Sequence, residues 1–182
     1  SISFDIFALE LFLAICYGAT FLLISDHEKA ENFLTIKTLS TYKPRIVQGT
    51  PTFWSMLKSY EWQNENPNMS MICGGESVSK EVIKYLLSLS KNVIQVYGPT
   101  ETTIWSTSKK INSIDDYNNI GSPISNTQCY ILNDDLQVLP HYISGELFIA
   151  GEGLALGYRN DPILTEKMFL NQNSNRIYRT GD

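Results

Sequence analysis

The sequence contains little of what several large classes of protein depend on. Its 182 residues include three cysteines and two histidines, and the formal net charge is −5. An acidic chain lacks the basic face that nucleic-acid-binding domains use, so binding to DNA or RNA is not expected. Cys16, Cys73 and Cys129 are odd in number and widely spaced, which indicates reduced core residues of a cytoplasmic protein. His27 and His141 have no partner at zinc-ligand spacing, which argues against a zinc site.

Long hydrophobic runs are also absent. The most apolar stretch, residues 9–24, is interrupted by Glu10 and broken at Tyr17 and Gly18, which leaves segments too short to span a membrane. No signal peptide is visible, and the chain does not begin with Met. What the sequence does contain is 43% hydrophobic and 12% aromatic residues, which is enough for the core of a globular protein.

The first two thirds of the chain alternate between helical and strand-like segments. Apolar spacing predicts helices at residues 5–17 and 28–41, from Pro51 through Leu57, and from Ser79 through Leu89. Short apolar runs predict strands at residues 21–24, 45–48, 69–73 and 93–96. Strands that alternate with helices of this length pair in parallel, so we expect an α/β fold.

The pattern changes after about residue 120. Short strand-like segments at residues 128–132 and 145–149 are separated by turn residues, which predicts an antiparallel, β-barrel-like subdomain. We therefore divide the chain into an α/β portion, residues 1–118, and an incomplete β-rich portion, residues 119–182.

The segment that follows the strand at residues 93–96 presents a hydroxyl and a carboxylate together. Gly98 and Pro99 end the strand, and Thr100 and Glu101 come directly afterwards. Ligands of open α/β sheets bind beyond the carboxyl ends of the strands, so this turn is a candidate phosphate and metal site. The alternative is an ordinary turn between a strand and a loop.

Four segments together resemble the adenylation domain of nonribosomal peptide synthetases, in the superfamily of AMP-binding, adenylate-forming enzymes. They are residues 3–5, 97–101, 145–158 and 178–182. The resemblance implies a ligase that activates an amino acid with ATP and Mg²⁺ and releases pyrophosphate. It also implies transfer of the acyl-adenylate to a phosphopantetheine thiol, with the peptidyl carrier and condensation domains of the same synthetase as partners.

The same resemblance implies roles for individual residues. Thr100 matches a residue that hydrogen-bonds a phosphate, and Glu101 matches the carboxylate that binds Mg²⁺, so these two are the expected catalytic residues. Asp182 matches the carboxylate that holds the ribose hydroxyls, and Gln95 stands where the family often has Asn near the adenine amino group. The implied nucleotide-binding set is Gly75, Glu76, Ser77, Gln95, Tyr97, Gly98, Thr100 and Asp182, with Tyr97 packing on adenine.

Asp5 distinguishes amino-acid substrates from other acids, because it matches the aspartate that holds the substrate α-amino group. Its alternative role is to cap a helix or to interact with the helix dipole. The substrate pocket implied by the resemblance consists of Asp5, Ile6, Leu9, Gln48, Ile72, Gly74, Val96, Ile104 and Trp105. This set resembles the glycine-selecting pattern, with Ile72 and Val96 in place of leucines. Trp105 and the branched aliphatic residues would fill the space that a larger side chain needs.

Some features of the family are missing from the sequence. The family's upstream phosphate loop and its C-terminal lysine have no counterpart, so we expect a fragment of a larger synthetase that has no adenylation activity alone. Gly151, Gly153 and Gly157 fit β-turns better than a phosphate cradle, and Leu156 stands where the family usually has Arg.

Three other interpretations remain open. An acyl- or aryl-acid adenylating ligase would share Thr100, Glu101 and Asp182 but would have little use for Asp5. A catalytically silent adenylation-like module would keep the fold for interaction with other domains. A generic doubly wound binding domain would explain the alternating strands and helices, but it would not explain the four spaced motifs.

Overall fold

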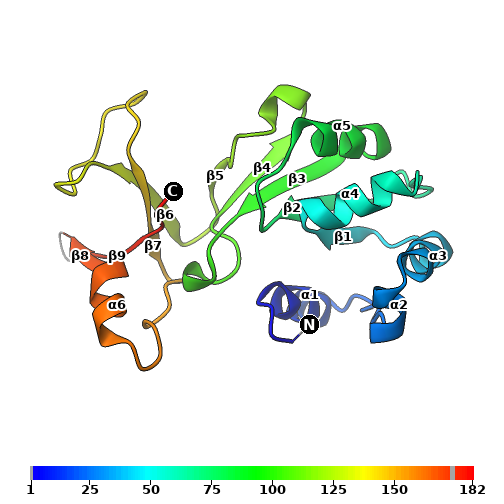
Figure 1. Ribbon diagram of the computed structural model, residues 1–182, viewed down its shortest axis with the longest axis horizontal. Helices are drawn as coiled ribbons and strands as arrows, with labels where there is room; N and C mark the ends of the chain where they lie inside the picture. The colour runs from blue at the N-terminus through cyan, green and yellow to red at the C-terminus, as the bar shows by residue number, and fades with distance from the viewer. Residues whose placement is uncertain (1, 173–174) are drawn as a thin grey trace. The chain divides into compact units, whose positions relative to one another are not determined.

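The computed structural model describes residues 2–172 and 175–182 and divides into two units (Figure 1). The first unit comprises the chain up to Tyr97 together with Ser108–Gly121. The second comprises Gly98–Thr107 together with Ser122–Asp182. The turn with Thr100 and Glu101 therefore belongs to the second unit, although it follows a strand of the first.

The first unit contains a mainly parallel sheet. Its strands lie in the order β1 (Ile46–Gly49), β2 (Ser70–Gly74), β3 (Asn92–Tyr97) and β4 (Thr107–Ile111). The β1–β2 and β2–β3 pairs are parallel, which confirms the α/β class expected from the sequence. Strand β4 was not predicted.

Helices α4 (Pro51–Ser59) and α5 (Lys80–Leu89) connect the parallel strands and pack against each other and the sheet. Thr50 and Ser79 cap them, because each hydroxyl accepts a 3.3 Å hydrogen bond from a backbone N–H three residues later. Pro51 occupies the first helical turn, as predicted. The residues they bury with the sheet include Trp54, Leu57, Met71, Ile83, Leu86 and Val93.

The segment before β1 differs from the sequence prediction. The prediction of a strand at residues 21–24 is wrong, because these residues are irregular and Leu23 is 73% exposed. An apolar run becomes a strand only where a neighbour accepts its hydrogen bonds, and β1 at the edge of the sheet pairs with β2 alone. Helix α1 (Ile6–Cys16) is present as expected.

The prediction of a single helix at residues 28–41 is also wrong. It is divided into α2 (Asp26–Ala30) and α3 (Asn32–Tyr42) at Glu31, whose φ of −106° and ψ of 101° are extended. Ser25 and Glu28 form a reciprocal capping box, which places the start of α2 before the predicted boundary. Leu39 is buried in the core, whereas Phe33 is 68% exposed.

The second unit contains an open antiparallel sheet in the order β6-β7-β9-β8. Its strands are β6 (Thr127–Leu132), β7 (Glu146–Gly151), β8 (Phe169–Gln172) and β9 (Asn175–Arg179). Antiparallel pairing is confirmed, whereas the strands that the structure describes do not close into a barrel. Helix α6 (Pro162–Met168) precedes β8, and the short elements η1 (Thr100–Thr102), η2 (Ile114–Asp116) and β5 (Ser122–Pro123) complete the fold.

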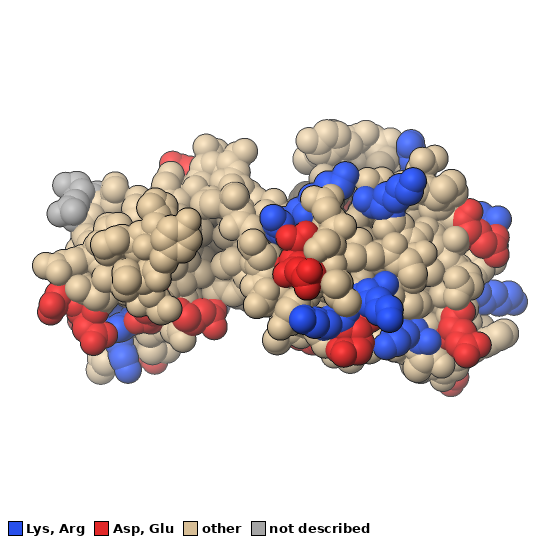
Figure 2. Space-filling model, turned by 90° about the horizontal axis from the view of Figure 1, so that it is seen from above, with Lys and Arg blue, Asp and Glu red and all other residues tan. Residues whose placement is uncertain are grey.

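The charged side chains are distributed unevenly over the face seen in Figure 2. Lys and Arg lie mainly over the first unit, where acidic side chains stand between them. Two ion pairs in that unit join Lys43 to Glu65 at 2.6 Å and Lys109 to Asp116 at 3.7 Å. Among the described residues, no helix is both long enough and apolar enough to cross a membrane.

Candidate functional site

The predicted site residues fall into two groups, one in each unit. The first unit contains Asp5, Ile6, Leu9, Gln48, Ile72, Gly74, Gly75, Glu76, Ser77, Gln95, Val96 and Tyr97. The second unit contains Gly98, Thr100, Glu101, Ile104, Trp105 and Asp182.

The parallel sheet brings several residues of the first group into register. Gln48 on β1 is the partner of Ile72 on β2, and Gly74 at the end of β2 is the partner of Val96 on β3. Gly75 follows β2 with a φ of 86°, a backbone conformation that glycine adopts without steric cost. These residues therefore lie at or near the carboxyl ends of adjacent parallel strands, which is where ligands of open α/β sheets bind.

Glu76 has a structural partner in the first unit. Its Oε2 accepts a 3.1 Å hydrogen bond from the backbone N–H of Thr52 and a 2.7 Å bond from the Thr52 hydroxyl. Thr52 lies in the first turn of α4, where a negative charge interacts favourably with the helix dipole. The carboxylate of Glu76 thus holds the segment after β2 against the start of α4.

Gln95 on β3 supplies a buried acceptor. Its side chain is 7% exposed, and its Oε1 has no hydrogen-bond partner in the part of the chain that the structure describes. An unsatisfied buried acceptor lowers the stability of the fold by about 1–3 kcal/mol. Such groups therefore usually have a function or a partner that the chain itself does not supply. The exocyclic amino group of adenine is a donor that fits this atom, so ATP is compatible with the residues present.

Helix α1 begins with the predicted substrate-binding residues. Asp5 occupies the N-cap position, but its side chain makes no capping hydrogen bond. The carboxylate therefore does not cap the helix, whereas an interaction with the helix dipole needs no such hydrogen bond. Ile6 is buried, and Asp5 and Leu9 are half-buried.

The loop of the second group is fixed from within. The Thr102 hydroxyl lies 3.0 Å from the carbonyl oxygen of Pro99 and 2.6 Å from the Ser106 hydroxyl, and the side chains of Thr102 and Ser106 are buried. A Cβ atom at Gly98 would lie 2.5 Å from the carbonyl oxygen of Ile104, so only glycine fits there.

Two consecutive residues of this loop have unusual backbone angles. Thr103 and Ile104 have φ values of 63° and 72°, which is costly for β-branched residues. This conformation turns the chain sharply between η1 and the buried Trp105, which is 8% exposed. Strained backbone of this kind persists only where surrounding contacts hold it.

Glu101 is held by both its backbone and its side chain. Its carbonyl oxygen accepts a 2.8 Å hydrogen bond from the N–H of Ala155, and its Oε1 accepts a 2.5 Å bond from the hydroxyl of Tyr158. The hydroxyl of Tyr178 on β9 lies 3.4 Å from that of Tyr158. Burial and the hydrogen bond to Glu101 raise the pKa of Tyr158, which keeps its phenol protonated and able to donate.

This carboxylate has the chemistry of a magnesium ligand. Glu101 is half-buried in a loop whose backbone is fixed, and Mg²⁺ prefers hard oxygen donors. Magnesium is usually held by one or two carboxylates together with substrate phosphates, so a single protein carboxylate fits that pattern.

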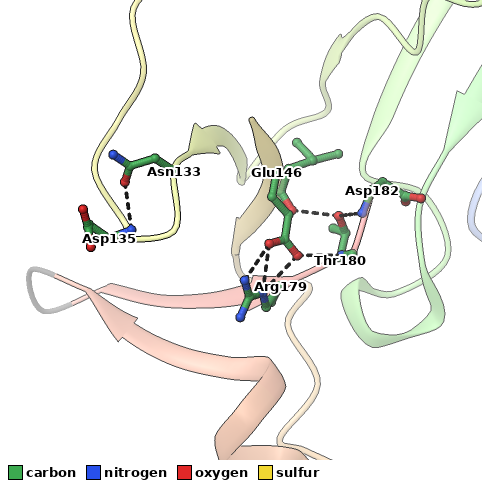
Figure 3. A network of polar contacts seen from close by, with 8 residues as sticks. Asn133, Asp135, Glu146, Arg179, Thr180 and Asp182 are labelled. Atoms are coloured by element: carbon green, nitrogen blue, oxygen red, sulfur yellow. Dashed lines mark hydrogen bonds and ion pairs between the residues drawn. The ribbon is translucent and has the colours of Figure 1, made fainter. Parts of the chain in front are cut away.

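Glu146 attaches the end of β9 to the start of β7 (Figure 3). The Nε of Arg179 donates to both oxygens of Glu146, at 3.0 and 2.9 Å, and Nη2 lies 2.8 Å from Oε2. The N–H of Gly181 donates to Oε1 at 3.1 Å. The hydrogen bonds from Arg179 lower the pKa of Glu146, so this carboxylate is ionised at neutral pH.

Asp182 follows this ion pair. Its backbone carbonyl accepts a 2.9 Å hydrogen bond from the N–H of Leu147, and its N–H donates to the Thr180 hydroxyl at 3.1 Å. The same hydroxyl donates to the carbonyl oxygen of Leu147 at 2.7 Å. The backbone of Asp182 is therefore fixed to β7, while the residue itself is exposed.

The sequence did not assign roles to Tyr158, Tyr178 or Glu146. All three lie in segments that carry the family resemblance, which is the signal that could have marked them. No local pattern pairs Tyr158 with Glu101, which is 57 residues away. Only the folded chain reveals that contact.

Comparison with known proteins gives a consistent result. The family described as AMP-binding enzyme matches residues 1–159. The whole chain is 36% identical over 187 residues to the dimodular nonribosomal peptide synthase of Bacillus subtilis (strain 168), of which it covers 8%. It is 37% identical over 188 residues to bacitracin synthase 1 of Bacillus licheniformis, of which it covers 3%. The chain thus spans a small part of the length of these relatives.

A solved structure shares the fold closely. It is that of holo-AB3403, a four-domain nonribosomal peptide synthetase bound to AMP and glycine. The TM-score is 0.93 at 34% identity, and the match covers all of this chain and 14% of that one.

Proposed function

Because the chain belongs to the family of AMP-binding enzymes, we propose that it forms substrate- and nucleotide-binding parts of an amino-acid adenylation domain in a nonribosomal peptide synthetase. In the proposed reaction an oxygen of the amino-acid carboxylate bonds to the α-phosphorus of ATP, and the bond from that phosphorus to pyrophosphate breaks. The aminoacyl group then passes to the phosphopantetheine thiol of a carrier domain, and AMP leaves. The observation that carries the proposal is the fixed carboxylate of Glu101 in the loop directly after β3.

The proposed nucleotide-binding roles are those that the family resemblance implies. Gln95 accepts a hydrogen bond from the adenine amino group, Tyr97 packs on the ring, and Asp182 binds the ribose hydroxyls. Thr100 hydrogen-bonds a phosphate, and Glu101 holds Mg²⁺. The bound ion would supply positive charge that stabilises the leaving pyrophosphate. The residues proposed to line this site mainly through their backbone are Gly75, Glu76, Ser77 and Gly98.

We propose that the amino acid is glycine. Asp5 binds the substrate ammonium group, and Trp105 fills the space beyond the α-carbon. Glycine bound to the related four-domain synthetase supports this choice. The remaining residues of the proposed pocket are Ile6, Leu9, Gln48, Ile72, Gly74, Val96 and Ile104.

The experiment that tests the proposal compares glycine with glycolate in the complete adenylation domain. Glycolate has a hydroxyl where glycine has an ammonium group, so only glycine can pair with Asp5. We expect ATP-dependent binding of glycine to exceed that of glycolate by about a hundredfold or more, and Asp5→Ala to abolish this preference. Asp5→Asn is the matched control, because it keeps the shape of the side chain and removes only its charge. It separates the effect of the lost charge from the effect of lost packing in Asp5→Ala.

Other outcomes would identify the competing interpretations. Equal binding of glycine and glycolate, unchanged in Asp5→Ala, would favour an acyl- or aryl-acid ligase. A folded domain that ATP does not protect against proteolysis, with the same result in Glu101→Ala, would favour a catalytically silent module.

A further inference from the structure

The segment that follows β7 contacts the Glu101 loop, which we define as Gly98–Thr107, at three points. Ala155 N–H donates to the Glu101 carbonyl at 2.8 Å, and the Thr103 hydroxyl donates to the Gly153 carbonyl at 2.6 Å. The third contact is the 2.5 Å hydrogen bond from Tyr158 to the carboxylate of Glu101. The first holds the backbone of Glu101, the second holds the side chain of Thr103, and the third acts on the side chain of Glu101.

The ring of Tyr158 is itself held in place. It packs edge-on against Phe169, with ring centroids 5.7 Å apart. Phe169 is 6% exposed and also packs on Tyr178 at 5.0 Å. The backbone N–H of Tyr158 donates to the Thr165 hydroxyl on α6 at 2.8 Å. The donor that reaches Glu101 is therefore fixed by contacts with α6, β8 and β9.

We infer that Tyr158 is a positioning residue that holds the Glu101 carboxylate in the orientation in which it binds Mg²⁺. The inference rests on the proposed function, because it requires Glu101 to be the metal ligand. A glutamate side chain has three rotatable bonds, and a hydrogen bond to one of its oxygens removes much of that freedom before the metal arrives. Groups that orient metal ligands in this way typically change metal affinity or activity by about 10- to 100-fold when they are removed.

The test measures how ATP binding by the complete adenylation domain depends on Mg²⁺, without amino acid and therefore without turnover. Calorimetry gives the ATP affinity in EDTA and across a range of Mg²⁺ concentrations. Mg²⁺ should increase the ATP affinity up to a maximum. We expect Tyr158→Phe to raise, by about tenfold, the Mg²⁺ concentration at which half of that increase is reached. The ATP affinity in EDTA should equal that of the wild type. In the Tyr158→Phe/Glu101→Gln double variant, the Mg²⁺ dependence should match that of Glu101→Gln alone.

Tyr85→Phe is the matched control. The Tyr85 hydroxyl also donates a hydrogen bond, 2.7 Å long, but its acceptor is the carbonyl oxygen of Trp62 in the first unit. This variant loses a comparable hydrogen bond and should keep the wild-type Mg²⁺ dependence. Glu101→Asp is a second variant in case Tyr158→Phe does not fold. It keeps the charge but draws the carboxylate back from Tyr158, and it should also raise the Mg²⁺ requirement.

Two results would overturn the inference while leaving the proposed function intact. One is a wild-type Mg²⁺ dependence in Tyr158→Phe, or in Glu101→Asp if only that variant folds. The other is equal weakening of ATP binding with and without Mg²⁺, which would show a general structural role. A wild-type domain whose ATP binding does not respond to Mg²⁺ would contradict the proposed function and the inference together.

Discussion

The carbonyl oxygen of Gly153 accepts a 2.6 Å hydrogen bond from the hydroxyl of Thr103, fifty residues earlier in the chain. The two segments approach so closely that a Cβ atom at position 153 would lie 2.7 Å from the carbonyl oxygen of Thr102. That atom belongs to the backbone and cannot rotate away. Glycine is thus required where the segment after β7 contacts the Glu101 loop, which gives Gly153 a packing role.

Gly153→Ala should displace the Glu101 loop. We expect the free energy of unfolding to fall by about 1–3 kcal/mol because of overpacking, and Mg²⁺-dependent ATP binding to weaken as Glu101 moves. Chemical denaturation and calorimetry of the complete domain measure the two effects. Gly18→Ala is the control: Gly18 has a φ of 60° but open space around it, so only stability should change, by about 1–2 kcal/mol. Equal ATP binding by both variants would contradict this account of the loop.

Gln95→Leu should separate stability from nucleotide recognition. Leucine removes the unsatisfied Oε1, so the nucleotide-free domain should be as stable as the wild type or more stable by about 1 kcal/mol. The affinity for ATP should fall by about tenfold, because the hydrogen bond to the adenine amino group is lost. Inosine triphosphate, which has a carbonyl in place of that amino group, should bind the variant and the wild type equally. A variant that is destabilised and still prefers ATP would show that Gln95 has a structural role instead.

Glu146→Gln should change stability mainly at neutral pH. The pKa of Glu146 is lowered from its ordinary value of 4.5 by the hydrogen bonds from Arg179, so the ionised carboxylate stabilises the fold above about pH 4.5. This contribution is lost as the pH falls through the folded-state pKa. Because the pair is partly exposed, we expect a loss of about 1 kcal/mol at pH 7.

Denaturation at several pH values measures this difference between the wild type and Glu146→Gln. The two curves should converge below about pH 4.5, the ordinary pKa of Glu146. Glu65→Gln is the control, since the exposed Lys43–Glu65 pair should contribute less. A constant gap between wild type and Glu146→Gln down to low pH would show that the charge of Glu146 is not responsible.

Trp105→Leu should broaden the choice of amino acid. The indole is buried in the loop that follows Glu101, and the smaller leucine would leave room for a methyl group on the substrate. We expect the ratio of alanine to glycine activation to rise by about tenfold. Trp62→Leu, at a buried tryptophan of the first unit, should lower stability without changing this ratio. An unchanged ratio in Trp105→Leu would remove Trp105 from the proposed pocket.

The elements that the sequence predicted correctly carry local signals. Thr50 with Pro51 and Ser79 mark helix starts through capping chemistry that depends only on nearby backbone. The same chemistry marks Ser25 as the cap of α2 and Asp161 as the cap of α6, whose helix was not predicted. Hydrophobic periodicity does not locate the starts of these two helices, whereas their caps do.

Other features could not be read from local sequence. Residues 21–24 are apolar enough to form a strand, but they do not pair with the free edge of β1. The contact between Tyr158 and Glu101 depends on how the segment after β7 folds back on η1, and spacing in the sequence does not encode this. The resemblance identified the segments, whereas only the structure shows which side chains meet.

Amino-acid-dependent exchange of pyrophosphate into ATP tests the central claim most directly. The measurement uses the complete adenylation domain with each amino acid in turn, together with Glu101→Gln. We predict Mg²⁺-dependent exchange that is strongest with glycine and lost in Glu101→Gln. A folded, ATP-binding domain in which no amino acid stimulates exchange would contradict amino-acid adenylation, and strongest exchange with a bulky amino acid would contradict the assignment of glycine.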